Sequence, residues 1–218
     1  MSKPINFSSL IKSANGNQPR TSEEIEHMIE DASFFYGKFL ESLGFDYKAD
    51  RQTIDTPKRV AKSFLKDLII GSVTEGPGMT IFPNDEGYKG VVIQTGIRVN
   101  SLCAHHNLPF NGWASVAYIP EDYVIGLSKL NRVVDWFARR PQMQESLTQQ
   151  VHTYLKDNLK CESVAVSISS KHLCCGNRGI KHPESVMTTN AFSGKFMEKD
   201  NLVREEFLHA ISKNGNQF

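Results

Sequence analysis

The chain of 218 residues carries 25 basic and 24 acidic side chains, and its formal net charge of +1 excludes an overall electrostatic attraction to nucleic acid or to an anionic membrane. Its apolar runs stay below the roughly 20 residues that span a bilayer, and its opening segment lacks the apolar core of a secretory signal, so we expect a cytoplasmic globular protein. Four cysteines are too few for a disulfide scaffold, and in a reducing compartment they indicate metal binding or a reactive thiol.

The N-terminal part of the chain predicts an arm and then a helix. Residues 1–20 are rich in Ser, Asn, Lys and Pro, which predicts a flexible arm. Thr21 and Glu24 have the spacing of a capping box, and an apolar stripe of helical period follows them and stops at Gly44. The stripe consists of Ile25, Met28, Ile29, Phe35, Phe39 and Leu43.

A second helix is predicted before any strand. It begins at Thr56-Pro57, because proline is favoured in the first helical turn, and it ends at Gly71. The stretch from Gly71 to Gly90 is rich in Gly and Pro and predicts a long connection. We therefore expect a helical region with its linker over residues 21–88 and a catalytic domain over residues 89–218.

Two strands are predicted on either side of a histidine pair. Residues 91–103 (VVIQTGIRVNSLC) are rich in β-branched side chains, and residues 113–120 (WASVAYIP) alternate well enough to form the antiparallel neighbour. Between them, Cys103 is followed two and three residues later by His105 and His106.

Two helices and two further strands complete the pattern. Ser128 is expected to cap a helix whose inner face carries Leu130, Val133, Val134 and Phe137. Pro141 is expected to open another helix, with Met143, Leu147, Val151 and Leu155 on one side. Residues 163–170 and 185–192 predict strands, and residues 201–213 predict a closing helix. Strands grouped apart from helices indicate an α+β fold.

The cysteines and histidines form two clusters, each directly after a predicted strand. The second cluster, KHLCC, contains His172, Cys174 and Cys175. If the two strand ends converge, a Cys₂His set forms from Cys103, His106 and Cys174 and leaves the fourth position of a tetrahedral metal open. An open position is typical of catalytic zinc, which lowers the pKa of bound water to roughly 7.

His105 and His172 then remain beside the metal and can transfer protons, because an ordinary imidazole has a pKa near neutrality. Cys175 is adjacent to Cys174 and would need a different direction to serve as a ligand, so it is interpreted as a bystander. Cys161 and His152 are expected to be structural, because an isolated cysteine is usually a small buried apolar residue.

The motifs SLCAHH, VAYIPEDYVIGLSKLNR, RRPQMQESLTQQ, KHLCCGNRG and VREEFL stand in this order along the chain. With them the sequence resembles the zinc-dependent GTP cyclohydrolase I family over roughly residues 21–211. The resemblance implies hydrolysis of GTP to 7,8-dihydroneopterin triphosphate and formate, the first step of pterin, tetrahydrofolate or deazaguanine biosynthesis. It also implies that Cys103, His106 and Cys174 hold zinc, and that His105 and His172 are the acid/base histidines.

The resemblance further implies a set of substrate contacts. Glu145 corresponds to the carboxylate that accepts hydrogen bonds from guanine, which suits the donors of guanine and disfavours adenine. Without the family motif, Glu145 would be read as an acidic residue that complements a helix dipole. The other implied contacts with the substrate and its triphosphate are Gln144, Ser128, Lys129, Arg132, Arg178, Arg59 and Lys62. Without the family, the basic residues among them would be read as a solvated face.

The fold and assembly implied by the resemblance are the tunnelling fold, a four-stranded antiparallel sheet with two helices on one side, in a homodecamer with active sites between subunits. The sequence departs from the family pattern at Ala104, where an acidic residue is frequent, and at Cys175-Gly176-Asn177. These departures bear on the surroundings of the metal and on its sensitivity to oxidation, since none of the expected ligands is missing.

Two other readings compete with this one. A tunnelling-fold relative that acts on another pterin or deazapurine would need an all-histidine zinc site or a nucleophilic cysteine without zinc. A non-catalytic zinc module for protein or nucleic acid would need four ligands and a basic stripe. Neither alternative fits Cys103, His106 and Cys174 together with the balanced charge of the chain.

Overall fold

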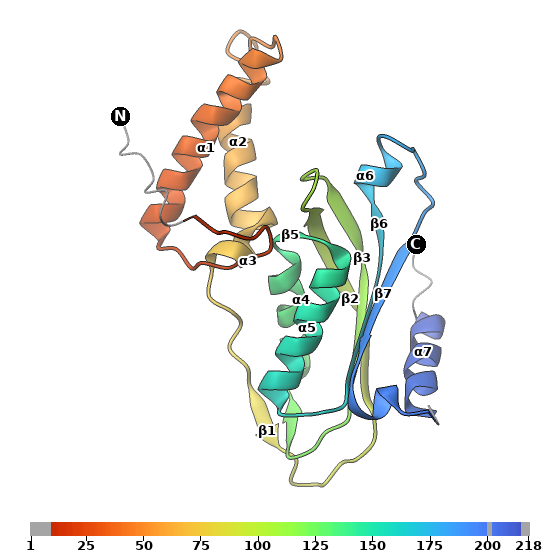
Figure 1. Cartoon of the computed structure of the whole chain (residues 1–218). Coiled ribbons are helices and arrows are strands. Elements are labelled where there is room, and N and C mark those ends of the chain that lie inside the picture. The colour runs from red at the N-terminus through yellow and green to blue at the C-terminus, as the bar shows by residue number, and fades with distance from the viewer. Residues whose placement is uncertain (1–9, 200–201, 215–218) are drawn as a thin grey trace. The chain divides into compact units, whose positions relative to one another are not determined.

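The computed structural model describes residues 10–199 and 202–214, so residues 1–9 of the expected arm lie outside the described residues (Figure 1). The chain divides into two compact units between Glu75 and Gly76, within the Gly/Pro-rich connection. Among the described residues, no helix combines the length and the apolar character needed to cross a membrane.

The N-terminal unit is helical, as predicted. It contains α1 (Ser22–Ser42), α2 (Thr56–Ser63), a π-helical turn η2 (Phe64–Leu68) and the short helix α3 (Ile70–Val73). The capping box is confirmed, because the Thr21 hydroxyl accepts from the Glu24 amide at 3.2 Å and the Glu24 carboxylate accepts from the Thr21 amide at 2.8 Å. The amides of Gln18 and Arg20 donate to the carbonyls of Ser72 and Val73, which ties residues 18–20 to α3.

Only part of the predicted α1 stripe is buried within this unit. Ile29 packs with Ala61 and Leu65 of the following helices in a small apolar cluster. Phe35, by contrast, is 67% exposed and Phe39 is 51% exposed. The helical period was therefore predicted correctly, but it does not tell how far along α1 the partner helices of this unit reach.

The second unit contains a sheet of five strands in the order β5-β2-β3-β6-β7. Its strands are β2 (Val92–Cys103), β3 (Pro109–Tyr118), β5 (Pro141–Gln142), β6 (Val164–His172) and β7 (Met187–Phe192). The α+β class is confirmed, whereas the count of four strands is wrong. Four of the strands are antiparallel to their neighbours, and β5 is a fifth strand that pairs in parallel with the end of β2 at the edge of the sheet. A strand of two residues shows no periodicity, so the sequence does not indicate β5, and Pro141 lies in this strand and not at the start of α5.

A separate pair of short strands, β1 (Ile81–Pro83) and β4 (Tyr123–Ile125), precedes the first helix of this unit. The helices α4 (Leu127–Ala138) and α5 (Gln144–Leu159) then pack on one face of the sheet, as predicted (Figure 1). Gly126 rather than Ser128 occupies the N-cap of α4, and α5 begins three residues after Pro141.

The opposite face of the sheet is also covered in part. The helix α7 (Leu202–Asn214) and the 3₁₀ turn η3 (Gly194–Met197) pack there through Phe207 and Phe196. Ala117 and Ala165 face these aromatic rings, while their neighbours Val116 and Val166 face α4 and α5, because side chains alternate along a strand. The description "two helices on one side" therefore holds for α4 and α5 and leaves out α7.

Candidate metal centre and active site

The two Cys/His clusters meet because β3 pairs with both strands that precede them. β2 ends at Cys103, and a tight turn returns the chain to β3, with the Cys103 amide donating to the Leu108 carbonyl at 2.8 Å. Asn107 adopts a left-handed conformation with φ of 52° in this turn. On the other side of β3, Phe110 pairs with His172, the last residue of β6. The short helix α6 (Leu173–Gly176) follows at once and carries Cys174.

Cys103, His106 and Cys174 come together as the sequence predicted, with one ligand atom from each lying within 4.8 Å of the others. The Cys103 Sγ lies 3.7 Å from Nδ1 of His106. Cys103 is buried, Cys174 is half-buried and His106 is exposed, so the group opens toward solvent on its histidine side. Two thiols and an imidazole are donors that borderline-soft divalent metals prefer.

The thiol of Cys174 is protonated at neutral pH when no metal is bound. Burial, followed by the neighbouring thiols of Cys103 and Cys175, raises the pKa of Cys174 to about 11. A thiolate is the form that ligates metal, so a bound divalent cation would displace the proton and supply the missing positive charge. The donor set therefore fits a metal ion in its geometry and in the kinds of ligand atom that it offers.

His105 and His172 lie beside this group. Nδ1 of His105 is 3.9 Å from the Cys103 Sγ, and the His105 ring meets the His106 ring edge-on with centroids 6.1 Å apart. His172 stacks on the buried ring of Phe110 at 4.5 Å and 10°. Burial lowers the pKa of His172, and the charge of Glu145 acts in the opposite direction. His172 is thus held in its neutral form more strongly than an exposed histidine.

Gln144 and Glu145 open α5 next to His172 and have opposite environments. Glu145 is exposed, and its charge reaches His172. Gln144 is 1% exposed, and its side-chain oxygen lies 2.8 Å from Nε2 of His172. Hydrogen bonds to Ser170 and Thr189 complete its surroundings. Neither Ser170 nor Thr189 was singled out from the sequence, although Ser170 lies two residues before His172 and so shares its face of β6.

The expected triphosphate residues lie on three separate elements. Ser128, Lys129 and Arg132 stand in the first half of α4, and Arg178 follows α6. Within the described part of the chain, Lys129, Arg132 and Arg178 make no ion pair with an acidic side chain, so their charges are available to an anion. Arg59 and Lys62 belong to α2 of the N-terminal unit, where both are exposed and Arg59 pairs with Asp55 at 3.4 Å.

The first half of α4 is remote from the metal-ligating group within one chain. The end of α4 leads into β5, whose Gln142 pairs with Cys103. Lys129 precedes the last residue of α4, Ala138, by nine residues, and a helix rises about 1.5 Å per residue. The Lys129 backbone is therefore about 14 Å from the end of α4 that adjoins the metal-ligating group. Ser128 and Lys129 therefore lie at the opposite end of α4 from this group.

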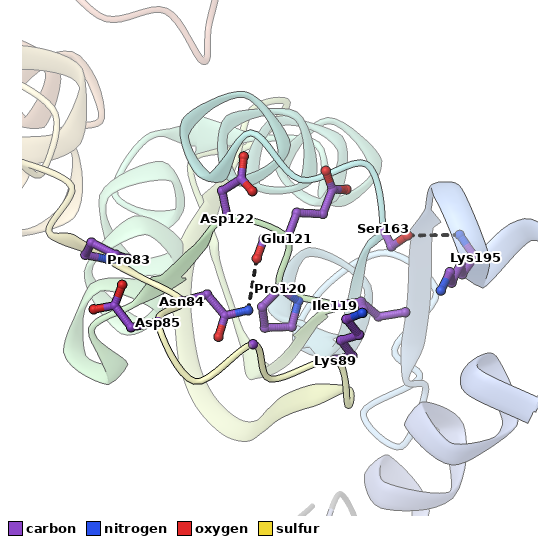
Figure 2. A pocket seen from close by; sticks show the side chains of 11 residues that line it. Pro83, Asn84, Asp85, Lys89, Ile119, Pro120, Glu121, Asp122, Ser163 and Lys195 are labelled. Atoms are coloured by element: carbon purple, nitrogen blue, oxygen red, sulfur yellow. Dashed lines mark hydrogen bonds between the residues drawn. The ribbon is translucent and has the colours of Figure 1, made fainter.

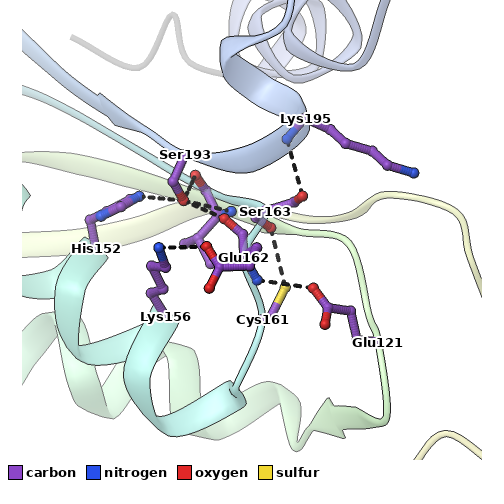
Figure 3. A network of polar contacts seen from close by, with 9 residues as sticks. Glu121, His152, Lys156, Cys161, Glu162, Ser163, Ser193 and Lys195 are labelled. Atoms are coloured by element: carbon purple, nitrogen blue, oxygen red, sulfur yellow. Dashed lines mark hydrogen bonds and ion pairs between the residues drawn. The ribbon is translucent and has the colours of Figure 1, made fainter.

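A pocket of about 560 Å³ lies at the other end of β3 and β6, near Ile119 and Ser163, and contains none of the predicted site residues (Figure 2). The residues expected to be structural lie close to this end in a polar network (Figure 3). There the buried Cys161 thiol donates to the Ile119 carbonyl at 2.9 Å, and Nε2 of His152 lies 3.0 Å from the Ser193 hydroxyl.

The chain is similar in sequence to known proteins. The family model for GTP cyclohydrolase I matches residues 34–212. GTP cyclohydrolase 1 of Flavobacterium johnsoniae is 43% identical over 190 residues, which cover 87% of this chain and 82% of that protein. The enzyme of the same name from Sulfurihydrogenibium sp. is 45% identical and covers 80% of this chain and 90% of its own. That of Salmonella gallinarum is 39% identical, with coverages of 89% and 84%.

The family match over residues 34–212 spans both compact units and the part of the chain that contains the residues selected for the site. The competing readings, a different tunnelling-fold enzyme or a non-catalytic zinc module, do not explain a match of this extent. The chain belongs to the GTP cyclohydrolase I family.

Proposed function

We propose that the chain hydrolyses GTP to 7,8-dihydroneopterin triphosphate and formate with zinc held by Cys103, His106 and Cys174. The observation that carries the proposal is the convergence of these three ligand atoms within 4.8 Å in a chain of the GTP cyclohydrolase I family. Zinc suits a set of two thiolates and one imidazole, and the set leaves one coordination position free. When bound, zinc would supply water of lowered pKa for attack on the purine.

The histidines beside the metal have the role of moving protons. His105 and His172 flank the group without belonging to it. A neutral imidazole can accept a proton at one nitrogen and return it to the leaving nitrogen of the opened ring. The stacking of His172 on Phe110 holds its ring plane in one orientation, which favours transfer in a fixed direction.

Glu145 is the proposed guanine contact. It is exposed at the start of α5, and its charge is felt by His172, so it lies at the edge of the same site. A carboxylate accepts hydrogen bonds only, and guanine presents an N–H and an amino group side by side. Adenine has no matching pair of donors, so Glu145 would select the base.

The triphosphate is proposed to bind Ser128, Lys129, Arg132 and Arg178, with Arg59 and Lys62 from α2. The distance between the start of α4 and the metal group supports a site completed by two chains, the α4 residues coming from a neighbour. A site completed by two chains agrees with the proposed tunnelling-fold homodecamer. We also propose that the protein is cytoplasmic. Gln144 is not included among the proposed substrate contacts, because its side chain is buried.

Removal and return of the metal test the proposal. The purified chain is treated with a chelator, assayed for formate and for pterin fluorescence from GTP, and then reloaded with zinc. We expect both products to disappear with the metal and to return in proportion to zinc bound per chain. A metal-free preparation that releases formate at the full rate would show that the Cys103–His106–Cys174 group is not the reaction centre.

A further inference from the structure

Gln144 is almost completely buried, and its side-chain nitrogen is fully engaged by the sheet. Nε2 donates to the carbonyls of Ile168 at 2.9 Å and Met187 at 3.0 Å and lies 3.1 Å from the Thr189 hydroxyl. Carbonyl oxygens accept and never donate, so the amide NH₂ group must face β6 and β7. The orientation of the amide is thereby fixed by its partners.

The amide oxygen of Gln144 consequently faces His172. Oε1 accepts a hydrogen bond from the Ser170 hydroxyl and lies 2.8 Å from Nε2 of His172. Since Oε1 can only accept, the hydrogen of this second contact must be carried by Nε2 of His172. Ser170 allows no alternative, because its single hydrogen already points at Oε1 while its oxygen lies 3.3 Å from the same Nε2.

We propose that Gln144 is a positioning residue that holds His172 in its Nε2–H tautomer and so presents Nδ1 as the nitrogen that exchanges protons with the substrate. The inference rests on the proposed function for the catalytic role of His172, but the tautomer itself follows from the hydrogen bonds alone. The Nε2 hydrogen stays on His172 and is donated to Oε1 of Gln144, so Nδ1 is the ring nitrogen left free to accept.

The same geometry argues against direct binding of GTP by the Gln144 side chain. Its two amide hydrogens and its oxygen are directed at five protein groups, and 1% of its surface is exposed. A substrate contact would require breaking buried hydrogen bonds without replacement. The residue next to it, Glu145, is exposed and carries the only side chain of the two that a ligand can reach.

The test combines imidazole ¹⁵N NMR with steady-state kinetics on the full-length zinc-loaded chain. Solid-state spectra of protein with ¹⁵N-labelled histidine report which ring nitrogen carries hydrogen, and the His172 signals are identified as those missing from His172→Ala. Gln144→Leu removes the acceptor at nearly constant volume. Gln149→Leu is the matched control, because Gln149 lies exposed on the same helix and contacts Thr153 instead.

We expect the parent to show hydrogen on Nε2 of His172 and none on Nδ1, and Gln144→Leu to show both tautomers. Its kcat should fall by about 10- to 100-fold, the range for losing a residue that orients a functional histidine, with KM for GTP and zinc content little changed. Gln149→Leu should match the parent in spectrum and rate.

Hydrogen on Nδ1 in the parent spectrum would overturn the proposal, and this result does not depend on whether Gln144→Leu folds. A rise in KM with unchanged kcat in Gln144→Leu would overturn it in favour of direct substrate binding. If instead His172→Ala keeps the parent kcat while the parent shows the Nε2–H tautomer, the catalytic role of His172 fails and the positioning by Gln144 stands.

Discussion

The two adjacent cysteines after β6 have different environments. Cys174 is half-buried and offers its sulfur to the group with Cys103 and His106, whereas Cys175 is exposed and is not a member of that group. Thiolates are poorly replaced by hydroxyls as ligands of zinc. We predict that Cys174→Ser is zinc-poor and inactive, while Cys175→Ser keeps its zinc and most of its rate with GTP.

Zinc per chain and initial rate, measured for both variants under reducing conditions, check this prediction. Metal loss in Cys175→Ser with full zinc in Cys174→Ser would move the ligand by one residue. Cys175→Ser should also resist inactivation by peroxide better than the parent, because it lacks the exposed thiol that can form a disulfide with its neighbour.

The adjacent residues His105 and His106 have different proposed roles, proton transfer for His105 and metal binding for His106. His106 supplies a ligand atom to the metal group, and His105 lies beside it. We predict that His105→Ala binds zinc as the parent does and loses activity by a factor of about 10² or more, the usual scale of general acid–base catalysis. His106→Ala should lose metal and activity together. Metal analysis that finds His105→Ala empty and His106→Ala full would exchange the two assignments.

Base selection is predicted to depend on Glu145. Replacing its carboxylate with an amide in Glu145→Gln turns one acceptor into a donor group that faces the donors of guanine. A hydrogen bond to a charged group contributes about 1.5–3 kcal/mol, so kcat/KM for GTP should fall by roughly 10- to 100-fold. ATP should be a poor substrate of both forms. Equal turnover of ATP and GTP by the parent would remove Glu145 from this role.

At the scale of elements, the pairing of β3 with β6 depends on a glycine, Gly112. A Cβ built on Gly112 would lie 1.9 Å from the carbonyl oxygen of Ser169, a backbone atom that cannot move away alone. We predict that Gly112→Ala destabilises the chain by about 3 kcal/mol, at the upper end of overpacking. Gly78→Ala is the control, because nothing lies within 4 Å of its added methyl group.

Thermal unfolding of the two glycine variants, with zinc content measured in parallel, checks this prediction. Gly112 pairs with Ser170, two residues from His172, so the variant should also bind zinc less well. A Gly112→Ala protein as stable as Gly78→Ala would show that the two strands can separate at no cost.

Most of the long helices and strands were predictable from the sequence, because the period of their apolar residues and the residues at their ends indicate the same element. The capping box at Thr21 and the stripe through Leu147, Val151 and Leu155 both appear as expected. The strand β5 and the exposure of Phe35 were not predictable, since a two-residue strand has no period and burial depends on partners distant in sequence. The metal group was predictable because two strand ends carry its ligands. The burial of Gln144 was not, because a glutamine at a helix start is usually solvated.

For the whole molecule, the separation of Lys129 from the metal group predicts that two defective chains can repair each other. Cys174→Ser lacks the metal centre, and Lys129→Ala lacks a triphosphate contact, yet each supplies what the other has lost if sites form between subunits. We predict that hybrids assembled from a 1:1 mixture regain about a quarter of the parent rate, the statistical share of intact pairings in a symmetric ring.

Each variant assembled alone provides the baseline for this measurement. A 1:1 mixture of the parent with a chain that carries both substitutions is the control, because it shows how the rate falls when intact chains are assembled with inactive ones. A mixture that stays at the sum of its two baselines would place all the residues of a site in one chain.

If the α4 cations reach the metal group of a neighbouring chain, as proposed, the activity per chain depends on protein concentration. A catalyst contained in one chain has the same turnover per mole at every protein concentration. A site shared between chains obeys mass action: on dilution toward the dissociation constant of the assembly, activity per chain falls, and GTP, by binding both partners at once, would slow that loss.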